Sequence, residues 1–114
     1  MSIEGVKKCL PTLKKLAQAR TRKQREKILI EAKSCIFYAI SEISKNTLNG
    51  NITLSDDSKK KLNPYRIELR KLSKKSIPLK KRKEIVYQSG GAFLPALLWP
   101  AISYLGGKLA DKFI

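Results

Sequence analysis

The stretch from Leu29 to Ile43 reads LIEAKSCIFYAISEI and places apolar residues at the spacing of one helical face. The residues that recur every three or four positions are Leu29, Ala32, Ile36, Ala39, Ile40 and Ile43. Lys33-Ser34 interrupts the pattern, and Ser34 is a residue type that caps a new helix. We therefore expect two consecutive helices here, with their apolar faces directed into one core.

Local signals mark further helix boundaries on both sides of this stretch. The segment Thr21–Gln24 matches a capping box, which predicts a helix that begins with the following residue, Arg22. Asn49-Gly50 predicts a helix end, because Gly readily adopts the left-handed conformation that closes a helix. Ser55 followed by two Asp residues predicts the next start, since the acids complement the positive end of the helix.

Prolines divide the rest of the apolar pattern into short helices. Pro11 interrupts a helical stripe at the N-terminus, and Pro64 predicts a kink. A last short helix is expected from Pro78 to about Gln88. No alternating pattern is long enough to propose a strand, so we expect an all-α fold: a small bundle of four or five short helices. Its core should contain Ile36, Ile40, Ile43, Leu69 and Leu72.

The charge of the chain points to a polyanionic partner. The 114 residues carry a formal net charge of +16, which nucleic acid or an anionic membrane would neutralise. Lysine and arginine clusters predict contacts with DNA phosphates; the candidates are Arg20, Arg22, Lys23, Arg25, Lys59, Lys60, Lys61, Lys80, Lys81, Arg82 and Lys83. Two of these groups, Lys59–Lys61 and Lys80–Lys83, are acid-free clusters. For either cluster alone, a solvent-exposed face without a ligand is the alternative. Tyr38, Tyr65 and Tyr87 could stack on bases, with core packing as the other role.

The residues needed for catalysis or for metal binding are missing from the sequence pattern. The chain has no His, and its two cysteines, Cys9 and Cys35, are too few for a zinc site. They are expected to be small buried apolar side chains. We predict no enzymatic activity, no cofactor and no metal. Residues 1–16 lack the continuous apolar core of a signal peptide, so we expect cytosolic synthesis and reduced thiols.

The character of the chain changes at Gly90-Gly91. Of the 25 Lys and Arg residues, 23 precede it, whereas residues 88–107 carry no charge. We therefore predict a basic helical domain over residues 1–88 and an apolar tail over residues 89–114. Pro95 and Pro100 should break a helix twice, which favours an interfacial, membrane-perturbing segment or a capsid contact over a membrane span. The contact residues would be Phe93, Leu94, Leu97, Leu98, Trp99, Tyr104 and Leu105. Packing of the tail into the helical core is the alternative.

The residues around the diglycine suggest proteolytic processing. Gln88-Ser89-Gly90-Gly91-Ala92 resembles the cleavage pattern of the adenovirus-type maturation protease. Glycines allow the backbone to lie close to an enzyme in a narrow channel. Gly90, Gly91 and Ala92 are thus the predicted cleavage residues, and the cut would release residues 92–114.

Four blocks of sequence resemble a known family. They are LNGNITLS (residues 48–55), LRKL (69–72), IPLKKRK (77–83) and QSGGAFLP (88–95), and they resemble small basic proteins of Polinton (Maverick) elements and adintoviruses. The similarity extends from about Leu16 to Leu105. Two departures are Pro78, where the family commonly has Ser, and the continuation of the tail through Lys108 to Ile114.

The resemblance implies a virion protein. Its expected partners are double-stranded DNA, bound without sequence preference, capsid proteins, an adenovirus-type maturation protease and a membrane. Its expected location is the virion, and the host nucleus or cytoplasm during assembly. The leading interpretation is a non-enzymatic protein that binds or condenses DNA and uses its apolar segment for membrane perturbation or capsid docking. A minor capsid or cement protein without a true DNA-binding role is the second interpretation, and a cellular nuclear DNA-binding factor is the third.

Overall fold

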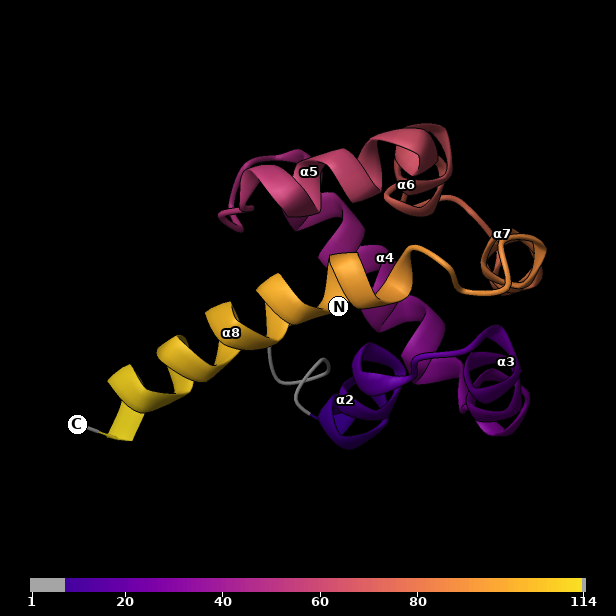
Figure 1. The fold of residues 1–114 in the computed structure, drawn as a ribbon. Coiled ribbons are helices and arrows are strands. Elements are labelled where there is room, and N and C mark those ends of the chain that lie inside the picture. The colour runs from indigo at the N-terminus through magenta and orange to yellow at the C-terminus, as the bar shows by residue number, and fades with distance from the viewer. Residues whose placement is uncertain (1–7, 114) are drawn as a thin grey trace.

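The computed structural model describes the backbone of residues 8–113 and the side chains of residues 8–103. Regular structure in this range is entirely helical, which confirms the small all-α bundle (Figure 1). The elements are α2 (Leu10–Gln18), α3 (Arg22–Glu31), α4 (Ser34–Leu48), α5 (Asp56–Leu62), the 3-10 helix η1 (Asn63–Tyr65), α6 (Arg66–Leu72), α7 (Leu79–Gln88) and α8 (Leu94–Phe113).

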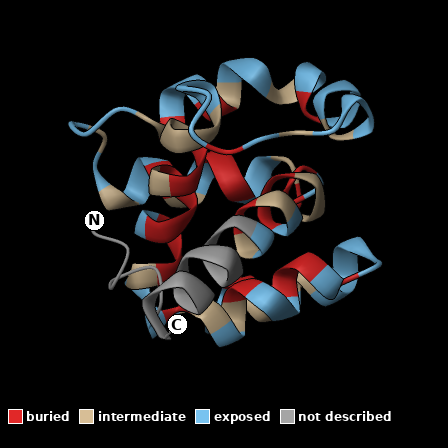
Figure 2. Cartoon of the chain, turned by 90° about the vertical axis from the view of Figure 1, so that its left-hand side faces the viewer, coloured by how far each residue is buried: buried red, intermediate tan, exposed pale blue. Residues whose placement is uncertain are grey.

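Helix α4 runs through the middle of the bundle and contacts α6, α7 and α8. Its buried residues include Ile36, Phe37, Ile40 and Ile43. Figure 2 shows the buried residues gathered at the centre and the exposed ones on the outer helix faces. The expected core is confirmed, because the three isoleucines are buried together with Leu69 and Leu72.

Most of the predicted helix boundaries are present. In the capping box, Gln24 N–H donates to Thr21 Oγ1 (3.2 Å) and Thr21 N–H donates to Gln24 Oε1 (3.3 Å). Ser55 Oγ caps α5 by accepting from the Ser58 amide, and Gly50, at φ 77°, follows the end of α4. The expected cap at Ser34 is wrong. Lys33 occupies the cap position without a side-chain hydrogen bond, and Ser34 is the first residue of α4.

Helix α8 is continuous where two breaks were expected. Pro95 lies in its first turn, where a missing amide proton removes no helical hydrogen bond, and Pro100 lies inside the helix. The preceding residue Phe93 and four residues of α8, Leu94, Leu97, Leu98 and Ala101, are buried in the same core as α2 and α4. This segment therefore completes the bundle, and the proposed boundary at residue 88 does not separate two cores.

The described residues contain no helix with both the length and the apolar character needed to cross a membrane.

Candidate nucleic-acid interface

Arg82 fixes the start of α7 to the loop that precedes it. Its Nε donates to the carbonyl oxygen of Ile77 (3.1 Å), and its Nη2 donates to the carbonyls of Lys75 (3.3 Å) and Lys74 (3.5 Å). The guanidinium carbon also lies 4.9 Å from the centre of the Tyr38 ring. Only 5% of Arg82 is exposed, so its charge is held inside the fold. We therefore remove Arg82 from the candidate phosphate contacts.

The other end of α7 meets the first turns of α3. Arg25 Nε donates to the carbonyl oxygen of Gly90 (3.1 Å), and a side chain at Gly90 would collide with the guanidinium of Arg22. Tyr87 Oη donates to the carbonyl oxygen of Leu29 at the other end of α3 (3.1 Å). These contacts hold α3 and α7 together, although 47 residues, 32–78, lie between the two helices in the sequence.

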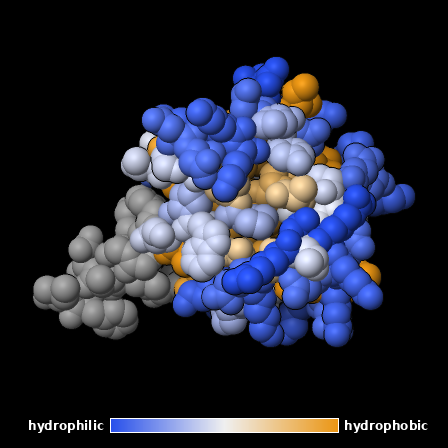
Figure 3. All heavy atoms as spheres, viewed as in Figure 1, coloured by the Kyte–Doolittle hydropathy of each residue, from blue (hydrophilic) through white to orange (hydrophobic). Residues whose placement is uncertain are grey.

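Exposed cations from three elements consequently lie along one side of the molecule, which we call the basic edge. It is defined by Arg22 and Lys23 of α3, Lys74 and Lys75 of the α6–α7 loop, and Lys80 and Lys81 of α7. These elements lie on the right of Figure 1, and Figure 3 shows mainly hydrophilic residues over the same side. Residues 73–88 contain six Lys or Arg residues and a single acid, Glu84.

Two acidic residues reduce the charge of the basic edge only weakly. Glu26 pairs with Arg22 at 2.8 Å, and Glu84 pairs with Lys81 at 3.8 Å. All four side chains are at least 44% exposed. Exposed pairs of this kind contribute little free energy and exchange easily with another anion. Both cations therefore remain available to a phosphate.

A hollow of about 380 Å³ adjoins the basic edge between α4 and the α6–α7 loop. Its lining contains Lys45, Lys74, Lys75 and Arg82, the hydroxyl-bearing residues Tyr38, Ser41 and Ser73, and the acid Glu42. Ser41 Oγ is buried and has no hydrogen-bond partner within the described part of the chain. Lysine ammonium and hydroxyl groups are donors of the kind that bind phosphate oxygens, so the hollow is a candidate extension of the basic edge.

Sequence reasoning missed Lys45, Lys74 and Lys75. Lys74-Lys75 is an acid-free lysine pair between two predicted helices, a signal that could have placed it beside the Lys80–Lys83 cluster. No local pattern points to Lys45. It lies on α4 and lines the hollow because the loop at residues 73–78 packs opposite it.

The remaining predicted DNA contacts differ in their position on the fold and in their exposure. Lys59, Lys60 and Lys61 lie on α5, and α6 separates α5 from α7 (Figure 1). Lys61 pairs with Asp57 at 3.0 Å. Lys83 is half-buried, with its Nζ 5.5 Å from the centre of the Phe37 ring, whereas Arg20 is exposed. The α5 lysines therefore form a separate basic surface.

The three candidate stacking tyrosines pack against the protein. The Tyr87 ring meets Phe37 edge-on at 5.9 Å, and the Tyr65 ring lies 5.6 Å from Phe93. Tyr38 lies under the guanidinium of Arg82. Each ring thus has a packing partner, although Tyr38 and Tyr87 keep 39% and 37% of their surface exposed.

The diglycine forms the turn that ends α7. Gly91 N–H donates to the Val86 carbonyl (3.2 Å) and Gly90 N–H donates to the Tyr87 carbonyl (2.9 Å), which is the Schellman arrangement. Both glycines are buried and adopt left-handed φ angles of 60° and 70°. Ala92 is exposed. Cleavage between Gly91 and Ala92 would first require this turn to open, and a cut alone would leave the buried residues of α8 in the core.

Most of the residues assigned to a membrane or capsid contact lie inside the fold. Phe93, Leu94, Leu97 and Leu98 are at most 1% exposed. Trp99 is 45% exposed and lies beside a hollow of about 570 Å³ that is also lined by Tyr65 and Pro95. The side chains of Tyr104 and Leu105 lie outside the described residues.

The described residues contain no group of three or more His, Cys, Asp and Glu side chains that could hold a metal ion. Comparison of the chain with protein-family models, with curated proteins and with solved structures finds no match.

Proposed function

We propose that this protein is a non-enzymatic virion protein that binds the DNA backbone, without sequence preference, through the basic edge. One observation carries the DNA-binding proposal. Helix α7 unites exposed cations from residues 22–23 and 74–81 along one side of the molecule. A spread-out set of lysines neutralises phosphates as mobile point charges and releases counterions from the DNA.

The dimensions of the basic edge suit a short length of duplex. The ten residues of α7 span about 15 Å at 1.5 Å per residue. A DNA strand advances about 3.4 Å along the duplex axis per phosphate, so this length matches about four phosphates of one strand. Lys74 and Lys75 at one end and Arg22 and Lys23 at the other extend the contact beyond α7.

The virion assignment depends on the resemblance to Polinton and adintovirus proteins. In that setting the genome is the DNA partner, and capsid proteins and the maturation protease are the protein partners. The protein would be located in the virion, and in the host nucleus or cytoplasm during assembly.

Salt-dependent binding to duplex DNA tests the DNA-binding proposal. If about six phosphates are neutralised, log affinity should fall against log salt with a slope of roughly −5. The variant K74Q/K75Q/K80Q/K81Q removes four of these contacts and should lose roughly 3.5 units of this slope. As a charge-matched control, K14Q/K33Q/K59Q/K60Q removes four exposed lysines that lie elsewhere on the surface. Equal losses in the two variants would show that net charge alone causes binding and would reject the basic edge as the site.

Docking to a capsid protein is a second candidate function, and exposed Trp99 is the observation that favours it. Its indole lies between the hollow shared with Tyr65 and Pro95 and a second hollow of about 520 Å³ lined by Thr53, Ser55 and Pro100. Large aromatic side chains beside such hollows are common anchors of protein interfaces. W99A should weaken binding to purified capsid protein at least tenfold while leaving DNA affinity unchanged. Unchanged capsid affinity would reject this role of Trp99.

A further inference from the structure

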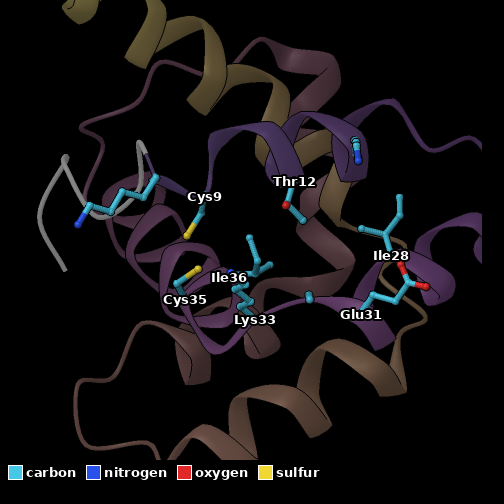
Figure 4. Close-up of a pocket in the computed structure, with 10 residues that line it drawn as sticks. Cys9, Thr12, Ile28, Glu31, Lys33, Cys35 and Ile36 are labelled. Atoms are coloured by element: carbon cyan, nitrogen blue, oxygen red, sulfur yellow. The ribbon is translucent and has the colours of Figure 1, made fainter.

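The only two cysteines of the chain meet across the fold. Cys9 is the residue before α2 and Cys35 is the second residue of α4, so 26 positions separate them. Figure 4 shows their sulfur atoms pointing toward each other. The two thiols share a hydrogen bond, and neither is part of a disulfide in this structure. Two helices thus hold the two thiols together.

The two thiols differ in their access to solvent. Cys9 is 2% exposed; its burial, followed by the interaction of its S–H with the Cys35 sulfur, raises the pKa of the Cys9 thiol to about 12. Cys35 is only half-buried and contributes to the lining of a hollow of about 300 Å³. A reagent that enters this hollow therefore meets Cys35 as the more accessible thiol.

The surroundings of the hollow favour an anionic reagent. Its lining includes Lys8, Lys15 and Lys33, against the single carboxylate of Glu31. Cations that line a hollow attract negatively charged molecules to it. None of these groups belongs to the basic edge.

We propose that Cys9 and Cys35 form a modification site for a small, carboxylate-bearing disulfide of the glutathione type. The Cys35 thiolate attacks one sulfur of that disulfide, a mixed disulfide forms, and the first external thiol departs with the proton that Cys35 gave up. Cys9 then releases its proton and attacks the Cys35 sulfur. The mixed disulfide breaks, the second external thiol leaves with that proton, and a Cys9–Cys35 disulfide remains. Two protein thiols are oxidised by two electrons, and one external disulfide is reduced to two thiols.

The closed disulfide would join the start of α2 to the start of α4. Such a link restricts the unfolded chain over the 25 residues between the two cysteines. It should raise the unfolding midpoint by on the order of 10 °C for a chain of this size. The reduced form would prevail in a reducing cytosol, and the linked form would accumulate in an oxidising environment.

Intact-protein mass spectrometry with oxidised glutathione tests this proposal. The reduced, full-length chain should lose the mass of two hydrogens, and peptide mapping should identify the Cys9–Cys35 link. C9S should stop at the mixed disulfide and gain one glutathione at Cys35, whereas C35S should remain unmodified. Cystamine, a cationic disulfide, should react about tenfold more slowly at low salt, with the difference reduced at high salt.

Other results would overturn the proposal. A wild-type chain that stays reduced, or that stops at the mixed disulfide, would show that the pair cannot close. Cross-links between two chains in place of the internal link would show the same. Equal rates for glutathione disulfide and cystamine would reject the preference for an anionic reagent. Because the mapping of the wild-type link needs no substitution, poor folding of either Ser variant would not obscure the result.

Discussion

Arg82 shows at the residue scale how a charged side chain can serve folding instead of binding. In the sequence it belongs to the basic run IPLKKRK, and nothing distinguishes it from its neighbours. In the fold, its donors satisfy three carbonyl groups of the α6–α7 loop, and Tyr38 covers its guanidinium. The role depends on where the loop carbonyls lie, and no local sequence pattern encodes their positions.

Substitution of Arg82 should destabilise the fold. R82M removes the guanidinium donors, so three loop carbonyls lose their hydrogen bonds to residue 82. This loss should lower the free energy of unfolding by about 2 to 4 kcal/mol. R82K should also destabilise, because an ammonium cannot reproduce the planar fork of donors. Urea denaturation measures both effects, with exposed K80M as the neighbouring control, expected within about 0.5 kcal/mol of wild type. Wild-type stability in R82M would contradict the structural role.

Gly91 and Gly50 allow a comparison of how much stability is lost when alanine replaces a glycine in the left-handed conformation. Both have positive φ angles, 70° and 77°, but a methyl group at Gly91 would lie 3.1 Å from Leu94 Cδ1, whereas nothing lies within 4 Å at Gly50. G50A should cost about 1 kcal/mol for conformation alone, and G91A should cost more because the buried Leu94 must also shift. Thermal unfolding checks the order of the two variants. A smaller loss in G91A than in G50A would refute the close packing of this turn.

At the scale of elements, the sequence predicted the helices that depend on local chemistry. The capping box at Thr21, the Ser55 cap and the end at Gly50 are all formed within a few residues of the chain. Helix α8 was missed because its prolines were treated as breaks. Pro95 occupies the first turn, and the buried residues Leu97 and Leu98 offset the hydrogen bond lost at Pro100. Tertiary burial therefore decided an element that local rules opposed.

Two substitutions on α8 test whether this helix belongs to the core. Leu97 is completely buried, so L97A should lower the free energy of unfolding by about 2 to 5 kcal/mol through lost contacts and a cavity. Trp99 lies two residues away and is 45% exposed, so W99A should cost less than about 1 kcal/mol. Chemical denaturation compares them directly. Equal, small losses would mean that the apolar segment does not pack as described.

At the scale of the whole molecule, the apolar segment and the basic part form one unit. Helix α2 makes its main contacts with α8, so removal of residues after Gln88 leaves α2 and α4 with exposed apolar faces. The sequence favoured an independently folded domain over residues 1–88. In the structure, buried residues of α8 complete the core of that domain, which argues against independent folding. A chain ending at Gln88 should lose cooperative thermal unfolding, whereas full-length protein should retain it. A cooperative transition in the shortened chain, at the wild-type midpoint, would contradict a shared core.

The basic edge is also a property of the whole molecule, because three separate segments supply its cations. The sequence identified α3 and α7 as basic but could not show that they lie together or that α5 lies apart. That arrangement follows from the turn at Gly90-Gly91 and from the loop held by Arg82. The α5 lysines were expected to extend the same surface. Because they lie apart from the basic edge, they provide a reference within the same molecule for measurements of DNA contact.

Lysine footprinting of the intact wild-type protein, with and without duplex DNA, tests the basic edge most directly. Acetylation rates read by mass spectrometry report each lysine separately, and no substitution is needed. We predict at least fivefold protection of Lys23, Lys74, Lys75, Lys80 and Lys81 at moderate salt, with Lys14, Lys59 and Lys60 changing less than twofold. The protection should disappear at high salt, where counterion release no longer favours binding. Equal protection of both groups, or protection confined to Lys59 and Lys60, would contradict DNA binding at the basic edge.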